Sequence, residues 1–432
     1  MSTVGSAYPL AFPQPRPLAR GHALIALVAT FPLWWFAGLF AFVWPIAAFF
    51  VLLALIRQGD VLFPRAFGLW LLLIGWALLS LAALSETDSA VLFAHRIAIL
   101  VAAGLIFLYI FNSSRETLPD RAIIDALTLF WAMLIVGSFI SMAFPSLSFH
   151  SPVELLLPAS LVANQFVHDL VHVDFAQVQS FLGYPVGRPN PFFTFTNAWG
   201  SGVALLTPIA VAGLAQSRSP LRRRLLLALL LLSFIPIVVS LNRGVWLALT
   251  LAFAYTALRF ALAKRLNAVA GLIGLAGFLL ILLFLTPLGG LLSDRLATPH
   301  SNQGREALYR EALERTEQSP LIGYGGPVPP ADATGPPVGT HSQLLFLSVS
   351  YGLPAVLLFV GWFALTFLRS GRSVSGPLFC AHVALLVFLM EAPYYLLQAH
   401  VVIAMIIAAF VWRAVVRGPA PAGDHVPRSA TA

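Results

Sequence analysis

Long, uninterrupted apolar runs recur along almost the whole chain. Most contain about 20 residues, the length at which an α-helix crosses a hydrocarbon core of roughly 30 Å. Runs of this kind predict membrane-spanning helices rather than half-buried strands, which would alternate apolar and polar positions. We therefore expect an all-α, polytopic transmembrane helical bundle of about twelve helices. The expected spans are two within Ala23–Ile56 and one each in Phe67–Leu84, Val91–Phe111, Ile123–Phe144, Ala198–Ala215, Leu225–Val239, Val245–Ala263, Ala268–Thr286, Leu344–Leu368, Pro377–Tyr394 and His400–Val416.

Two long polar segments interrupt this pattern, one at Pro145–Thr196 and one at Pro287–Ser342. In the first, apolar residues recur at roughly helical spacing over Val153–Phe181, which predicts a helix lying along the membrane surface. The second contains a predicted helix at Arg305–Thr316. The Gly- and Pro-rich stretch that follows, Gly323–Gly339, is expected to be a mobile flap.

The composition agrees with a chain embedded in a membrane. Hydrophobic residues make up 59% of the 432 residues and charged residues only 10%, which leaves too little polar surface to coat a soluble globule. The net charge of +8 does not indicate nucleic-acid binding, because the arginines lie in short clusters between apolar runs. We interpret residues 23–417 as a single transmembrane domain, with tails at residues 1–22 and 418–432.

The basic residues predict how the bundle is oriented. Alternate short connections are rich in Arg and Lys, and the positive-inside rule assigns such connections to the cytoplasm. On this basis both tails are cytoplasmic, both long loops face outward, and the chain resides in the inner, cytoplasmic membrane. The basic connections contain Arg57, Arg65, Arg115, Arg121, Arg218, Arg222, Arg223, Arg224, Lys264, Arg265, Arg369, Arg372, Arg413 and Arg417.

Arg243 lies in a very short turn, Ser240 to Gly244, between two apolar runs. The turn falls on the predicted outer face, where the positive-inside rule disfavours positive charge. In one interpretation Arg243 is an interfacial anchor whose guanidinium reaches the lipid headgroups. In the other it binds an anionic group.

Arg305 begins the predicted helix of the second loop and follows a glycine. A guanidinium beside the free N–H groups of a helix start is suited to binding phosphate. Arg310 and Arg315 lie farther along the same helix and alternate with acidic residues at the spacing of ion pairs. A solvated helix face therefore explains these two arginines.

Two further ionisable residues have two interpretations each. His341, at the outer mouth of an apolar run, is either a hydrogen-bonded interfacial residue or a proton acceptor near neutral pH. Arg96 lies inside the apolar run Val91–Phe111, where a charge is costly. It either serves the functional site or forms a structural pair with Glu391.

One group of residues has the spacing of metal ligands. His168 and His172 are four residues apart and share one face of a helix, with Asp169 and Asp174 close by. Zinc sites use such pairs, but no third ligand is evident. The polar face of a surface helix explains the same residues, so we predict no metal site.

Several segments, in their order along the chain, resemble the O-antigen ligase and O-antigen polymerase superfamily of membrane glycosyltransferases. The family pattern has an Asn-containing helix start, an Arg-Gly turn, a large loop with an Arg-initiated helix and a Pro-Leu-x-Gly-x-Gly stretch, and a histidine that opens the next helix. The chain departs from this pattern at Asn242, where serine is usual, and at Ser342, where asparagine is usual. The similar residues are Thr196 and Asn197, Asn242 to Gly244, Arg305 to Ala312, Pro320 to Gly325, and His341 with Ser342.

This resemblance implies a metal-independent glycosyltransferase without cofactors. It implies that the donor is an undecaprenyl-pyrophosphate-linked glycan and that the acceptor is a hydroxyl group on a glycan, lipid or protein. Membrane lipids are further expected partners, and nucleic acid is not. Arg243 and Arg305 would neutralise the departing pyrophosphate, and His341 would position or deprotonate the acceptor. The expected substrate contacts are Arg96, Arg188, Asn197 and Arg310.

Two alternatives to a ligase remain open. A polysaccharide polymerase of the same superfamily would differ only in its acceptor. A transporter of polysaccharide or lipid would instead have paired broken helices and polar residues near the bilayer midplane, whereas the candidate residues gather at the outer ends of the predicted helices.

Overall fold

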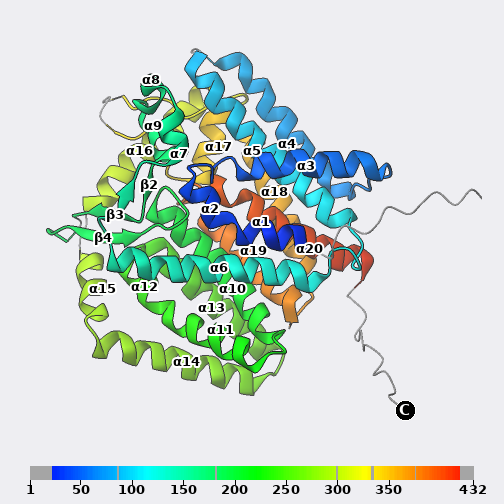
Figure 1. The fold of residues 1–432 in the computed structure, drawn as a ribbon, viewed down its shortest axis with the longest axis vertical. Helices are drawn as coiled ribbons and strands as arrows, with labels where there is room; N and C mark the ends of the chain where they lie inside the picture. The colour runs from blue at the N-terminus through cyan, green and yellow to red at the C-terminus, as the bar shows by residue number, and fades with distance from the viewer. Residues whose placement is uncertain are drawn as a thin grey trace, which may run out of the picture.

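The computed structural model describes residues 22–84, 87–180, 182–297, 300–331, 335–374 and 376–418. Within these ranges the chain is mostly helical, and its long helices pack as a bundle (Figure 1). The predicted helical fold class is therefore confirmed. The predicted tails fall largely on residues 1–21 and 419–432, which lie outside the described residues.

The described helices vary in length from single turns to long segments. They are α1 (His22–Ala29), α2 (Phe31–Phe36), α3 (Val43–Gln58), η1 (Arg65–Phe67), α4 (Gly68–Leu79), η2 (Ser80–Ala83), α5 (Thr87–Asn112), α6 (Asp120–Ala143), α7 (Pro152–Leu156), α8 (Ala159–Val162), α9 (Gln165–Val171), α10 (Thr196–Ala215), α11 (Pro220–Leu232), α12 (Phe234–Val239), α13 (Arg243–Leu262), α14 (Leu266–Leu285), α15 (Leu288–Ala297), α16 (His300–Gln318), α17 (Gln343–Tyr351), α18 (Leu353–Ser370), α19 (Gly376–Glu391), η3 (Gln398–His400) and α20 (Val401–Arg417).

In the described part of the chain, eight helical segments are long and apolar enough to cross a membrane. Four other predicted crossings coincide with shorter or interrupted helices. Helices α3 and α19 are apolar but have only 16 residues each, and the α1–α2 and α11–α12 pairs are broken. Pro32 and Pro236 follow these two breaks, and proline cannot donate to the carbonyl four residues earlier. Twelve crossings therefore remain a prediction.

Helices α10 and α20 form the centre of the bundle. Helix α10 packs against α6 and α19, and α20 packs against α5, α18 and α19. Both helices are buried over most of their length, as expected for helices that are apolar on all sides. Glycines bring α10 close to its neighbours, since a β-carbon at Gly213 would overlap the side chain of Thr128.

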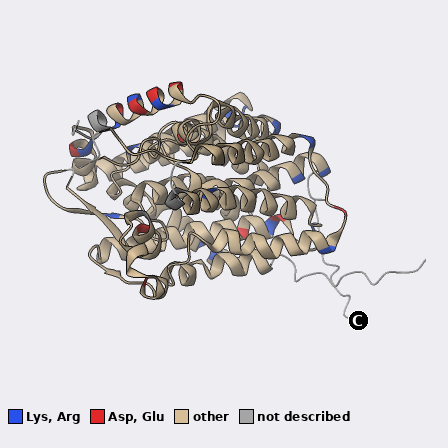
Figure 2. Cartoon of the chain, turned by 90° about the horizontal axis from the view of Figure 1, so that it is seen from above, with Lys and Arg blue, Asp and Glu red and all other residues tan. Residues whose placement is uncertain are grey.

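The two ends of the bundle differ in how their charges are arranged. Figure 2 shows Lys and Arg at the end where α20 terminates, which we call the tail end. There the fully buried Arg413 donates to the Asp120 carboxylate, and Arg222 donates to Asp125 at 2.5 Å. We call the opposite end, which carries the described residues of the two long loops, 145–180, 182–195, 287–297, 300–331 and 335–342, the loop end. Helix α16 lies there with alternating basic and acidic residues (Figure 2).

The first long loop does not form the single surface helix predicted from its apolar spacing. It contains the short helices α7, α8 and α9 and two antiparallel strand pairs. Leu157 is extended between α7 and α8 because it precedes Pro158. The strand pairs are β1 (Ser148–Phe149) with β2 (Val173–Asp174), and β3 (Ala176–Gln179) with β4 (Val186–Pro189).

The second long loop ends by interrupting a predicted membrane helix. The predicted helix at Arg305–Thr316 is confirmed as part of the longer α16. Because α16 begins at His300, the prediction that Arg305 lies at a helix start with free N–H groups is wrong. The predicted span Leu344–Leu368, however, is divided into α17 and α18 at Gly352, where φ is +81°. The Leu353 N–H donates to the Pro320 carbonyl at 2.8 Å, so the end of the loop packs into the break. A prediction from the local apolar run misses this contact.

The Gly- and Pro-rich stretch of the second loop is attached to α17 near its start and is closed by a hydrogen bond within the stretch. The Tyr324 N–H donates to the Val349 carbonyl at 2.9 Å, and the Val338 N–H donates to the Val328 carbonyl at 2.8 Å. Residues 332–334 lie outside the described residues. The mobility of this flap remains a prediction.

The predicted orientation can be tested with single cysteines in a Cys380→Ala background. Glu306 is exposed on α16 at the loop end, and Ser219 is exposed at the start of α11. We expect a membrane-impermeant thiol reagent applied to intact cells to label the Glu306→Cys protein and not the Ser219→Cys protein. The latter should react only after the membrane is permeabilised. Labelling in the reverse pattern would contradict the orientation.

Candidate functional site

Four arginines from separate elements gather at the loop end. Burial, together with the nearby positive charges of Arg295 and Arg305, lowers the pKa of Arg188 to about 10. Burial and the charges of Arg243 and Arg305 likewise lower the pKa of Arg295. Arg188, with a pKa of about 10, is still charged at neutral pH, and the mutual lowering of these pKa values shows that positive charge is concentrated here. The arginine cluster consists of Arg188 in β4, Arg243 at the start of α13, Arg295 in α15 and Arg305 in α16.

Arg188 is almost completely buried and is held by three different segments. Its Nε donates to the Ser240 carbonyl at 2.5 Å, and its terminal nitrogens donate to the side-chain oxygens of Gln179 and Asn197. Gln177 lies opposite Arg188 in the β3–β4 pair. The side chain therefore links the β3–β4 hairpin to the start of α10 and to the turn before α13. Its donors are largely used within the protein, which favours a positioning role.

The turn that presents Arg243 is stabilised by Asn242 and Tyr395. Leu241 has a φ of +53°, and Asn242 caps α13 by accepting from the Val245 N–H at 3.4 Å. The Tyr395 hydroxyl donates to the Asn242 side chain and accepts from the Gly244 N–H at 3.1 Å. Asn242 thus performs the capping role that a serine can also perform.

Gly244 allows this close approach, because a β-carbon there would overlap the Tyr395 ring. Arg243 is consequently fixed at the first position of α13, a helix of 20 residues. The dipole of such a helix start favours an anion, while the Gly244 and Val245 N–H groups already donate to Tyr395 and Asn242. The helix dipole and the guanidinium charge of Arg243 together favour an anionic group at this position.

Arg305 and His341 approach this turn from the second loop. The Arg305 guanidinium lies over the Tyr395 ring at 5.9 Å from its centre. Among the described residues, no carboxylate lies within ion-pair distance of Arg305. The Tyr309 hydroxyl contacts the carbonyl oxygens of His341 and Pro393, both at 3.4 Å. Helix α16 is thereby held over the start of α17.

The protonation states at the site suit proton transfer. Burial, and then the positive charge of Arg305, lower the pKa of His341 below its ordinary value of 6.5, so the imidazole is neutral at pH 7 and can accept a proton. Its Nδ1 lies 3.3 Å from the Thr340 hydroxyl. Burial raises the pKa of Tyr395 to about 12, which keeps this phenol protonated.

Ser342 has a structural role beside His341. Its hydroxyl accepts from the Leu345 N–H at 3.2 Å, which caps α17, and donates to the Ala392 carbonyl at 3.1 Å. The side chain is 1% exposed. The serine at this position therefore holds α17 against the segment that carries Tyr395.

Two of the predicted substrate residues lie apart from the arginine cluster. Arg96 packs over the Phe346 ring at 5.8 Å and against Gly326. The alternative pairing with Glu391 is wrong, since no ion pair joins these two among the described residues and Glu391 is fully buried elsewhere. Arg310 is exposed and forms a 3.3 Å ion pair with Glu306.

Sequence reasoning missed Arg295 and Tyr395. Arg295 lies on the predicted outer face. The criterion that singled out Arg243, a positive charge on that face, could therefore also have found Arg295. Its Nε donates to the Leu241 carbonyl at 3.2 Å, in the same turn. Tyr395 has no comparable pattern, because an aromatic residue near the end of an apolar run is common.

Comparison with known families supports the resemblance seen in the sequence. Residues 227–360 match the family model described as O-antigen ligase. This segment is just under a third of the chain and contains Arg243, Arg295, Arg305 and His341. A search of curated proteins gives no match. The resemblance to the O-antigen ligase family is therefore confirmed over this region, together with the membrane character expected of such a glycosyltransferase.

The role of Tyr395 in holding the turn can be measured through stability. Tyr395→Phe removes two hydrogen bonds of a buried hydroxyl, which together are worth about 1–3 kcal/mol. We expect a lower apparent melting temperature in detergent than for the parent protein. Tyr309→Phe is the matched control, because its hydroxyl makes only two 3.4 Å contacts and should cost less. An equal loss in both variants would contradict the role assigned to Tyr395.

Proposed function

From the match to the O-antigen ligase family, we propose that this chain transfers a glycan from an undecaprenyl-pyrophosphate-type lipid carrier to an acceptor hydroxyl. The observation that carries the proposal is the concentration of Arg188, Arg243, Arg295 and Arg305 at the loop end. Such a cluster suits a pyrophosphate, which carries several negative charges and accepts bidentate hydrogen bonds from guanidinium groups.

The proposed reaction is a direct displacement at the anomeric carbon of the donor sugar. The acceptor oxygen forms the new bond to this carbon while the bond to the pyrophosphate oxygen breaks. The leaving pyrophosphate takes the electron pair, so its negative charge grows in the transition state. In this proposal Arg243 and Arg305 stabilise this charge, because interactions that strengthen in the transition state accelerate the reaction.

His341 is the proposed base for the acceptor hydroxyl. Its neutral imidazole can take the hydroxyl proton as the acceptor oxygen bonds to the sugar. The Thr340 hydroxyl lies beside Nδ1, and within the described residues Nε2 has no hydrogen-bond partner. We therefore assign proton acceptance to Nε2.

Asn197 and Arg188 have supporting roles in this proposal. The Asn197 side-chain oxygen accepts from Arg188, which leaves its NH2 group to contact the donor sugar. Arg188 positions Asn197 and adds positive charge. Arg96 and Arg310 make no described contact with the cluster, so any contact they make is with a distant part of the donor or acceptor.

We further propose that residues 23–417 form one transmembrane domain of the inner membrane, with the loop end on its outer face and both tails in the cytoplasm. The concentration of Lys and Arg at the tail end supports this orientation (Figure 2). A glycan, lipid or protein can serve as acceptor. A second lipid-linked glycan as acceptor would make the enzyme a polymerase, and the chemistry at the site would be the same.

Leaving-group stabilisation predicts a specific ranking of variants. Loss of one such electrostatic donor typically costs about 10²- to 10³-fold in rate, so we expect this decrease for Arg243→Ala and for Arg305→Ala. Arg305→Lys keeps the charge but loses the planar fork and should recover only part of the activity. The measurement is transfer of glycan from purified lipid-linked donor by each folded protein.

The matched control is Arg315→Ala on the same helix, where Arg315 pairs with Glu311 at 3.5 Å on a partly exposed face. Its transfer rate should equal that of the parent. Parent-like rates for both Arg243→Ala and Arg305→Ala would show that these arginines are membrane anchors.

The proposed base predicts a pH dependence with a definite sign. The pKa of His341 lies below 6.5, so turnover should be constant near pH 7 and should fall as the pH drops through that pKa and the imidazole is protonated. His341→Ala should lower turnover about 10²-fold or more while donor binding is retained. Unchanged turnover in this variant, or a rate that rises on acidification, would exclude His341 as the base.

A further inference from the structure

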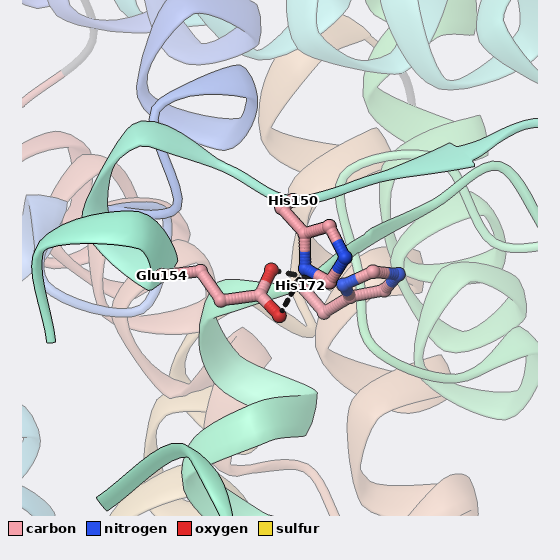
Figure 3. A group of neighbouring side chains, drawn as sticks. All are labelled: His150, Glu154 and His172. Atoms are coloured by element: carbon pink, nitrogen blue, oxygen red, sulfur yellow. Dashed lines mark hydrogen bonds and ion pairs between the residues drawn. The ribbon is translucent and has the colours of Figure 1, made fainter. Parts of the chain in front are cut away.

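A buried carboxylate in the first long loop is surrounded by three histidines. Glu154, in α7, is 5% exposed. Its two oxygens lie 2.8 Å from His150 Nδ1 and 2.9 Å from His172 Nδ1 (Figure 3). The Nε2 of His168 lies 3.8 Å from the same carboxylate. We name His150, Glu154, His168 and His172 the histidine cluster.

The local fold brings these residues together from two separate segments. Strands β1 and β2 pair with Phe149 opposite Val173, which places the adjacent His150 and His172 side by side. Ser151 caps α7 by accepting from the Glu154 N–H at 3.1 Å, and this fixes the first turn of the helix. Sequence reasoning identified His168 in α9 and His172 directly after it, but not Glu154 or His150. The strand pairing that joins these residues is not visible in the sequence.

The spacing of the donor atoms fits a metal ion. Bonds of about 2.0–2.1 Å in a tetrahedral zinc site place neighbouring ligand atoms roughly 3.4 Å apart. The three separations from Glu154, of 2.8, 2.9 and 3.8 Å, bracket this value. The ligand atoms of His150, Glu154 and His172 all lie within 4.8 Å of one another. Small side-chain movements would therefore suffice to close the site around an ion.

Hydrogen bonds alone explain only part of this arrangement. They account for His150 and His172, but the 3.8 Å separation at His168 Nε2 is too long for a hydrogen bond. Its ring stacks on that of His172, with the centroids 4.6 Å apart. A shared ion between them and Glu154 would account for all three histidines.

Carboxylates also lie behind the ring nitrogens that do not face Glu154. His172 Nε2 is 3.8 Å from Asp174, and His168 Nδ1 is 3.8 Å from Asp169. Histidine ligands of zinc usually direct their second nitrogen to a carboxylate, which fixes the tautomer and strengthens the bond to the metal. At 3.8 Å the two aspartates do not accept hydrogen bonds from these nitrogens in the structure, but they place negative charge beside two of the histidines.

We propose that the histidine cluster is a binding site for a divalent transition-metal ion, with Zn²⁺ as its occupant. The ligands are Glu154, His150 and His172, and His168 is the fourth donor. Imidazole and carboxylate ligands suit zinc. The His150 side chain is 67% exposed, so an ion can enter from solvent.

The ion's role is structural and separate from glycan transfer. It ties α7 to α9 in the loop that leads into β3 and β4. Asp169, His172 and Asp174 also line a cavity of about 130 Å³ that extends to Gln177. The Gln177 side chain accepts from the Thr196 N–H at the start of α10 at 3.2 Å. A bound ion would therefore stiffen the support of Arg188 and Asn197 without contacting the reacting atoms.

Calorimetric titration of the full chain with Zn²⁺ tests this proposal directly. The protein is purified without a polyhistidine tag and stripped with a chelator. We expect about one ion per chain and a rise in apparent melting temperature on binding. His150→Ala removes an exposed ligand and should fold, and Glu154→Gln removes the central one. Each should weaken binding about tenfold or more, and Asp174→Asn, which removes only a nearby charge, should weaken it less than either.

Leu155→Ala is the matched control, because Leu155 is exposed in α7 and offers no ligand. It should bind Zn²⁺ as the parent does. Binding only at millimolar Zn²⁺, or equal binding by the parent, His150→Ala and Glu154→Gln proteins, would overturn the proposal. The cluster would then be a hydrogen-bonded network around a carboxylate.

Discussion

The buried guanidinium of Arg188 joins three segments that are far apart in the sequence. It donates to Gln179 in the β3–β4 hairpin, to Asn197 at the start of α10 and to the carbonyl of Ser240 before α13. A buried charge is costly unless its hydrogen bonds are made, so these segments are stable only as a unit. Arg243 follows Ser240 in the same turn and therefore cannot be displaced without disturbing Arg188.

The arginines at the two ends of the bundle differ in the charges that surround them. At the tail end, acidic partners compensate the arginines, as in the ion pair of Arg413 with Asp120. At the loop end, Arg188 and Arg295 are buried within reach of other arginines, which lower their pKa values further. Keeping like charges together costs free energy that folding alone does not require. An anionic substrate would relieve this repulsion on binding, and groups with perturbed electrostatics are common at functional sites.

The sequence predicts those features that depend on local pattern. Apolar runs of sufficient length predicted the eight helical segments that are long and apolar enough to cross a membrane, and a positive charge on the predicted outer face singled out Arg243. Features that depend on contacts distant in the sequence were missed. The break at Gly352 requires the packing of Pro320, the turn before α13 requires Tyr395, and the setting of Glu154 requires the β1–β2 pairing. The residues that make these distant contacts are of types common in loops and membrane helices, so the sequence alone does not mark them.

The affinity of the protein for the released carrier tests the central claim most directly. If the arginine cluster binds the leaving pyrophosphate, the parent protein in lipid nanodiscs should bind undecaprenyl pyrophosphate more tightly than undecaprenyl monophosphate. One additional charge-assisted contact is worth about 1.5–3 kcal/mol, which corresponds to roughly a tenfold preference or more. Arg305→Ala should lose this preference while it still inserts and folds. Equal affinity of the parent for both lipids would contradict the account.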